Sequence, residues 1–184
     1  PSYTAGSNQV TDEDAGQQIV TNWATSISAG QPDESGQVLI FTIDNDNNAL
    51  FSSQPVMSSD GELSYTPDDN THGSATVTLI LSDDGGTDNG GDDTSDPLTF
   101  TITVVPVADT PAITGTVTLE DTQSDTGLTI TRNIVDGDEV THFQITNIEN
   151  GLLFQQDGSE GIIDGDFITF LQGNTGLRFT PSTD

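Results

Sequence analysis

Leu98-Thr-Phe-Thr-Ile-Thr-Val104 alternates strictly, with every apolar residue on one side and threonine on the other. The segment 76–81 alternates in the same way, and shorter stripes occur at 39–43 and 63–65. A period of two indicates a strand with one buried face, because successive side chains of a strand point to opposite sides. No stretch keeps a 3.6-residue period, and β-branched residues and turn formers dominate. The sequence therefore predicts an all-β chain.

The same module occurs twice in the chain. Gln37-Val-Leu-Ile-Phe-Thr-Ile43 aligns with Glu139-Val-Thr-His-Phe-Gln-Ile145, and Leu63–Pro67 aligns with Leu177–Pro181. Between them, Ala49-Leu-Phe51 is matched to Leu152-Leu-Phe154. A repeat of about 100 residues is longer than the roughly 20–50 residues of a solenoid unit, and it fits a complete β-sandwich.

The two copies differ in length after their Thr-Pro pair. The first copy continues to Pro106 through the two clearest strands, whereas the second stops three residues after Pro181. We expect a complete repeat at 1–109 and a partial one at 110–184 that lacks its final strands, within a much larger native protein. Missing strands leave open edges, so this second copy is expected to be partly disordered, cleaved from a longer chain, or completed by strands of another chain.

Charge and composition narrow the function classes. Two Lys+Arg residues against thirty Asp+Glu give a net charge of -28, which repels nucleic acid and anionic membranes and invites cations. The chain has no cysteine and no apolar run near the ~20 residues that span a bilayer. We expect an extracellular location, no nucleic-acid partner and no direct membrane insertion. The acidity is also consistent with a salt-adapted, soluble surface.

Most single carboxylates lie beside Asn, Ser or Gly and are expected to form turns. The polar tract from Asp83 to Asp96 is expected to be a long hairpin loop between the two best strands, with an ion site of its own as the alternative. It lacks the tandem nine-residue units of a calcium-binding β-roll. The expected turn formers are Asp44, Asp46, Asp60, Asp68, Asp69 and Asp157.

Several short motifs carry a family resemblance. They include Asp12-Glu-Asp-Ala-Gly16, Ser64-Tyr-Thr-Pro67, the ending Phe100-Thr-Ile-Thr-Val-Val-Pro-Val-Ala-Asp-Thr-Pro111, and Asp136-Gly-Asp-Glu139 in the second copy. With these, nearly the whole chain resembles the bacterial cadherin-like domains that form long runs in giant secreted and surface proteins. The resemblance implies tandem immunoglobulin-like, Greek-key β-sandwiches, the second one truncated, with Ca²⁺ bound where two domains meet.

The resemblance also implies a ligand set for calcium. It assigns Glu13 as the acid at the opening strand, Asp109 as the linker acid, and Asp136 with Asp138 as the Asp-x-Asp. Asp83 or Asp84, at the end of a strand, would be an additional ligand. The linker holds one carboxylate where the animal family has several acids and asparagines, so we expect one or two ions. The implied partners are calcium, neighbouring repeats, and a cell-surface polysaccharide or another protein.

Function hypotheses from three classes can be compared. The favoured one is a calcium-stiffened stalk or adhesion module of a bacterial secreted protein. The alternative is a polysaccharide-binding module that stacks sugar on Trp23, although apolar Ile19, Val20 and Ile27 around this residue predict its burial. We expect no enzyme, because His72 and His142 lack partner motifs and no nucleophile or phosphate-binding motif is present.

Overall fold

The computed structural model describes residues 1–88 and 91–183; residues 89 and 90 of the polar tract, and residue 184, lie outside the described part. Strands dominate the described residues, which confirms the all-β prediction. The chain divides into two compact units, Pro1–Val107 and Ala108–Asp184, called here the first and the second unit. The division after Val107 lies two residues before the end of the first repeat as the sequence predicted it, at Asp109.

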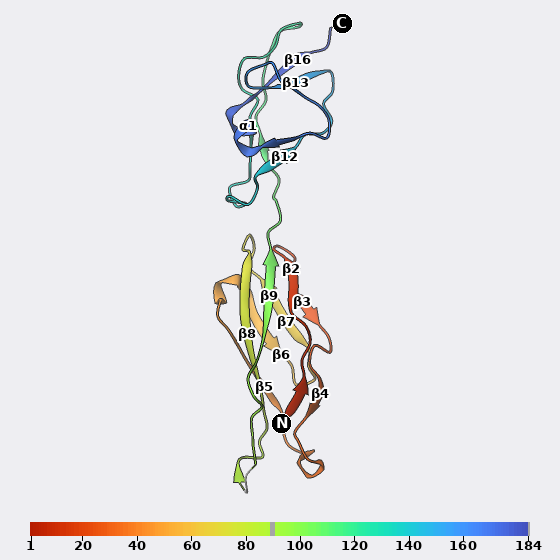
Figure 1. Ribbon diagram of the computed structural model, residues 1–184, viewed down its shortest axis with the longest axis vertical. Coiled ribbons are helices and arrows are strands. Elements are labelled where there is room, and N and C mark those ends of the chain that lie inside the picture. The colour runs from red at the N-terminus through yellow and green to blue at the C-terminus, as the bar shows by residue number, and fades with distance from the viewer. Residues whose placement is uncertain (89–90, 184) are drawn as a thin grey trace. The chain divides into compact units, whose positions relative to one another are not determined.

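The first unit is built from two main sheets (Figure 1). One has the strand order β2-β9-β8-β5 and the other the order β3-β7-β6, while β1 pairs with β4. β2 runs parallel to β9, and the other pairs are antiparallel. The strands are β1 (Ser2–Thr4), β2 (Gln9–Asp12), β3 (Gln18–Val20), β4 (Thr25–Ser28), β5 (Ile40–Asn45), β6 (Phe51–Met57), β7 (Leu63–Pro67), β8 (Gly73–Ser82) and β9 (Leu98–Val105), with 3-10 turns at Pro32–Glu34 and Asn48–Leu50.

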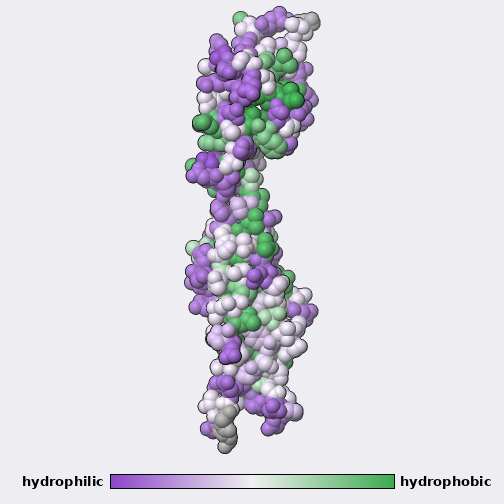
Figure 2. Space-filling model, in the orientation of Figure 1, coloured by the Kyte–Doolittle hydropathy of each residue, from purple (hydrophilic) through white to green (hydrophobic). Residues whose placement is uncertain are grey.

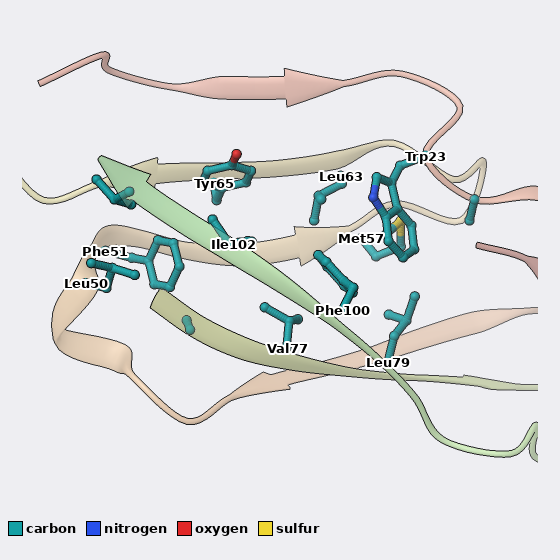
Figure 3. Packing of buried hydrophobic residues seen from close by; sticks show 13 residues of the cluster. Trp23, Leu50, Phe51, Met57, Leu63, Tyr65, Val77, Leu79, Phe100 and Ile102 are labelled. Atoms are coloured by element: carbon teal, nitrogen blue, oxygen red, sulfur yellow. The ribbon is translucent and has the colours of Figure 1, made fainter. Parts of the chain in front are cut away.

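The alternating faces of β8 and β9 form the centre of the first core. Val77, Leu79 and Ile102 are fully buried. They pack with Leu63 and Tyr65 of β7, in the opposite sheet (Figure 3). The period-two patterns therefore predicted both the strands and the faces that they bury.

Trp23 is buried in the same core, as the sequence predicted, with 3% of its surface exposed. Its ring centroid lies 4.3 Å from that of Phe100, and its Nε1–H donates to the carbonyl oxygen of Ser7 at 2.9 Å. A buried indole usually needs such a partner for its N–H. Trp23 is therefore a packing residue and offers no surface on which a sugar could stack.

The tract between β8 and β9 is a hairpin loop in its described part. Beyond the regular ladder, Ser82 bridges to Thr94, and the N–H of Ser95 donates to the carbonyl oxygen of Leu81 at 2.8 Å. The N–H of Asp83 donates to the carbonyl oxygen of Asp93 at 3.0 Å. The two strands thus approach each other before the loop turns, as expected for a hairpin.

The second unit holds shorter strands and one helix. Its sheets have the orders β14-β13-β16, β12-β15 and β10-β11. The helix is short and was not predicted; a capping box between Thr169 and Gln172 begins it. The elements are β10 (Ala112–Ile113), β11 (Ile130–Thr131), β12 (His142–Gln144), β13 (Gly151–Gln155), β14 (Gly161–Ile162), β15 (Phe167–Thr169), α1 (Phe170–Thr175) and β16 (Leu177–Pro181).

Two strand pairs of the second unit correspond to pairs of the first. β10 pairs with β11 as β1 pairs with β4, and β13 pairs with β16 as β6 pairs with β7. Asp14 and Asp121, each of which follows a glutamate, Glu13 and Glu120, have left-handed φ angles of 58° and 56°. The second unit differs by an insertion between β13 and β16 that contains β14, β15 and α1.

One detail of the sequence alignment is wrong. Phe51 pairs with Pro67 at the end of β7, and Gly151 pairs with Pro181 at the end of β16. Because the two prolines are aligned, Phe51 corresponds to Gly151 and not to Phe154. The cause is irregular pairing in β6, whose register against β7 shifts twice, while β13 pairs regularly with β16. Bulges of this kind add residues to one strand without changing its neighbour, so sequence matching places the strand a few residues off.

Two isoleucines test the assignment of the first core. Ile102→Ala should destabilise the first unit by about 2–5 kcal/mol, because Ile102 is fully buried. Ile19→Ala is the matched control, since Ile19 is 57% exposed, and it should cost much less. Urea unfolding followed by the fluorescence of Trp23, the single tryptophan, reports on the first unit alone. Equal losses for the two variants would contradict the assignment.

Candidate metal ligands

Most of the predicted turn-forming carboxylates bind nearby donors. Asp46 Oδ1 accepts from the N–H of Thr76 at 2.7 Å, and Asp44 Oδ1 accepts from the N–H of Asn45 at 2.9 Å. Asp60 accepts from the hydroxyl of Ser58. Asp44 and Asp60 bind donors one and two residues away, whereas Asp46, directly after the end of β5, binds a donor in β8. These contacts account for the three side chains without an ion.

Asp157 shows the same behaviour with an electrostatic consequence. Its Oδ1 accepts from the N–H of Ser159 at 2.9 Å, and its Oδ2 accepts from the Ser159 hydroxyl at 2.9 Å. The backbone bond from Ser159, followed by the bond from its hydroxyl, holds the pKa of Asp157 below its usual value. Hydrogen bonds to the charged form favour that form.

Glu13 is a different kind of carboxylate, because it is buried at 4% exposure. It follows β2, and its N–H donates to the carbonyl oxygen of Val105 at 2.9 Å. Its Oε1 accepts from the N–H of Val107 at 2.9 Å, which holds the side chain against the end of β9. Oε2 is buried without a hydrogen-bond partner; His72 Nδ1 lies 3.6 Å away, beyond hydrogen-bonding distance.

Asp136 of the second unit has the same properties. Its exposure is 2%, and its Oδ1 accepts from the N–H of Asp109 at 2.7 Å. Its Oδ2 is buried and has no hydrogen-bond partner. Gly137 follows with a φ of 57°, a left-handed conformation that favours glycine and turns the chain after Asp136. The structure thus joins two residues of the predicted ligand set, Asp109 and Asp136.

Asp138, the second acid of the Asp-x-Asp motif, is directed to solvent. Its Oδ1 accepts from Arg132 Nη2 at 2.7 Å, and its side chain is fully exposed. Arg132 also lies over the ring of Phe170, with its guanidinium carbon 4.1 Å from the ring centroid. The partner of Asp138 is therefore a side-chain cation, whereas Asp136 Oδ2 is buried without a hydrogen-bond partner.

Asp83 and Asp84 lie at the other end of β8 from Glu13. β8 is ten residues long, or about 30 Å at ~3.3 Å per residue. Gly73 at its start pairs with Val104, beside the segment that holds Glu13, whereas Asp83 follows its last residue. Asp83 Oδ1 accepts from Gly85 N–H, and Asp84 Oδ1 accepts from Val38 N–H. Neither acid can share an ion with Glu13.

His72 is the neighbour of Glu13 that sequence reasoning missed. It lies 59 positions further along the chain, outside any motif, and was set aside for lack of a partner. Its proximity follows from the strand order and direction. β2 ends beside the end of β9, and β8 begins beside the same end of β9. Glu13, which follows β2, and His72, which precedes β8, therefore lie at one end of the sheet. Only knowledge of this order could have placed His72 beside Glu13.

The basic side chains leave the acidic surface largely uncompensated. Both arginines are already paired, Arg132 with Asp138 and Arg178 with Asp125 at 3.5 Å. Thirty acidic residues thus face two basic ones. The remaining negative charge must be balanced by cations from solution. Within the part of the chain that the structure describes, no helix has the length and apolar character needed to cross a membrane.

No family model and no curated protein matches this chain. The resemblance to bacterial cadherin-like domains therefore rests on the short sequence motifs alone.

Asp157 provides a pH-dependent test of the turn assignment. Its depressed pKa means that the turn is stabilised above the ordinary carboxyl pKa of 3.8, and this contribution is lost as the pH falls through the folded-state value. Ser159→Ala removes the hydroxyl donor and keeps the backbone donor, so the pKa should rise part of the way toward the ordinary value. Carboxyl-carbon NMR titration measures it. An unchanged pKa would show that the Ser159 hydroxyl plays no part.

Proposed function

We propose that this chain is a pair of calcium-binding, cadherin-like repeats that act as a stiffened stalk or adhesion module of a large bacterial secreted or surface protein. In this proposal the repeats are tandem immunoglobulin-like, Greek-key β-sandwiches, the second of them incomplete. The two packed sheets of the first unit support the sandwich. The observation that carries the function is a buried carboxylate oxygen without a hydrogen-bond partner in each repeat, at Glu13 and at Asp136.

A buried carboxylate oxygen without a partner is costly. An ionised group removed from water loses its hydration, and this loss must be offset by a counter-charge or by hydrogen bonds. The remaining oxygen of each side chain is already engaged by a backbone N–H, which fixes the carboxylate in one orientation. A cation beside Glu13 Oε2 or Asp136 Oδ2 would supply the missing charge.

Calcium fits these ligands better than other common ions. It takes six to eight oxygen ligands at roughly 2.3–2.6 Å and accepts carboxylates, backbone carbonyls and water in irregular arrangements. Loop segments such as 108–109 and 136–139 provide such oxygens. Magnesium requires a tighter octahedron, and the chain has no cysteine for a soft metal.

Binding that is confined to the folded repeat would also stiffen it. An ion that binds only the native state stabilises that state by about 2.7 kcal/mol when its concentration is 100 times Kd. The acidic loops would then be held in one conformation at millimolar calcium and would loosen without it. This dependence suits an extracellular module, because calcium is available there and cysteines are absent here.

The carbohydrate-binding alternative loses its main residue. Trp23 and Tyr65 are 3% and 2% exposed, so neither ring can stack on a sugar. Sugar binding would need an aromatic surface elsewhere in the chain. We therefore retain the calcium-dependent module as the single proposed function.

Asp136→Asn should have opposite effects with and without calcium. In chelator, the variant should be at least as stable as the natural chain, because it removes a buried charge that has no partner at Oδ2. With millimolar Ca²⁺, the natural chain should gain stability by several degrees in Tm and the variant should gain much less. Calorimetric unfolding of the full chain gives both values, and titration calorimetry reports calcium binding directly.

Asp138→Asn is the matched control, because Asp138 is exposed and paired with Arg132. It should keep most of the calcium response. Magnesium and sodium chloride at equal ionic strength separate a specific ion site from a salt-adapted surface. If calcium raised Tm no more than these salts do, the proposed function would be abandoned, although the all-β fold would stand.

A further inference from the structure

The second unit carries an open apolar groove. It encloses about 680 Å³. Several side chains at its wall are far more exposed than those of a closed core; Ile113, for example, is 64% exposed. Apolar residues also reach the surface of this unit among hydrophilic ones (Figure 2). The groove is defined here by its principal apolar lining residues, which are Ile113, Phe143, Ile145, Leu153, Leu177 and Phe179.

The corresponding residues of the first unit are covered by β8 and β9. Leu63 and Tyr65 of β7 align with Leu177 and Phe179 of β16. In the first unit both lie in one cluster with Val77 and Ile102, from β8 and β9. Leu177 is buried as Leu63 is, but Tyr65 is 2% exposed whereas Phe179 is only partly buried.

Tyr3 of β1 makes the same comparison from another element. Its hydroxyl donates to the carbonyl oxygen of Leu79 in β8 at 3.2 Å. Ile113 occupies the matching place in β10, since β10 pairs with β11 as β1 pairs with β4. Tyr3 thus extends from β1 to β8, and the corresponding Ile113 of β10 lines the groove.

One edge of β12 is open beside this groove. The N–H of Ile145 donates to Asp166, and the N–H of Phe170 donates to Thr141. Antiparallel pairs alternate between bonded and non-bonded residues, so the odd-numbered residues of β12 bind β15. The backbone groups of His142 and Gln144 therefore point the other way. Among residues 1–88 and 91–183, β12 has no strand neighbour on that side.

This open edge corresponds to the edge of β5 that binds β8. Asp46 donates its N–H to the carbonyl oxygen of Thr76, so the even-numbered residues of β5 are those bonded to β8. Phe41 aligns with Phe143, and both strands turn their odd-numbered side chains toward the core. Residues 40 and 42 of β5 therefore match residues 142 and 144 of β12. β15 occupies the opposite edge and leaves the β8 position open.

We propose that the groove and the open edge of β12 receive a β-strand pair of the β8–β9 type, carried by the same polypeptide after Pro181. The first strand of the pair would extend the β12 sheet as β8 extends β5. Its alternate apolar residues would fill the groove, as those of β8 and β9 fill the first core. A small apolar ligand could fill the volume, but it would leave the backbone groups of the open edge unpaired.

The test adds a second copy of residues 68–106 directly after Pro181 in the full chain. The unfolding equilibrium constant of the second unit should fall by about 100-fold or more, because burying one aliphatic side chain already changes such a constant about ten-fold. Urea unfolding followed by the amide NMR signals of Phe143 and Ile168 reports on this unit. The matched control carries threonine at the added positions copied from Val77, Leu79, Phe100 and Ile102, and it should show no gain.

A proline at the open edge gives a second test, which does not require that the threonine control folds. Gln144→Pro removes an N–H that points to the open edge, so it should abolish the gain in the extended chain. In the 184-residue chain it should change the constant by no more than about two-fold, because proline is tolerated on an unpaired edge. Gln144→Thr should keep the gain.

Three results would overturn the proposal. The extension could fail to stabilise the second unit, or the threonine control could stabilise that unit to the same extent. Alternatively, sedimentation of the 184-residue chain could show a dimer that Gln144→Pro dissociates, which would make a second copy the occupant. None of these results depends on calcium, so the proposed function is tested separately.

Discussion

The burial of one face of β8 and β9 is the interaction on which the first unit depends. These strands lie side by side in the middle of the four-stranded sheet and bring Val77, Leu79 and Ile102 to complete burial. β5 and β2 attach to their outer edges, so the position of Glu13 after β2 also follows from β9. The second unit has strand pairs that correspond to β1–β4 and β6–β7. Its described residues, 108–183, form no counterpart of β8 and β9, and apolar side chains line an open groove there.

The sequence predicted those features that depend on local alternation. The strands at 76–81 and 98–104 and the burial of Trp23 all followed from period-two patterns or apolar neighbours. Features set by pairing between distant segments were not accessible. The place of His72 beside Glu13 and the distance of Asp83 from it depend on strand order and strand length. The pairing of β15 with β12 depends on an insertion that has no counterpart in the first copy.

The acidic residues divide into two groups that composition alone could not separate. Several accept hydrogen bonds from backbone or hydroxyl donors, among them Asp44, Asp60 and Asp157, and need no ion. Glu13 and Asp136 are instead buried, each with one oxygen held by a backbone N–H and the other without a hydrogen-bond partner. The proposed calcium chemistry depends on this second group. Asp138 was predicted beside Asp136 by the motif, yet its ion pair with Arg132 directs it to solvent.

Amide hydrogen exchange in the unmodified chain tests most directly the claim that the units share one design and differ in closure. Protected amides are expected at Thr42 and Asp44, which face β8, and at Phe143 and Ile145, which face β15. Rapid exchange is expected at Gln144, since its N–H points to the open edge of β12. Protection of Gln144 equal to that of Thr42 and Asp44 would contradict this claim, because it would show that the β8 position of the second unit is already filled.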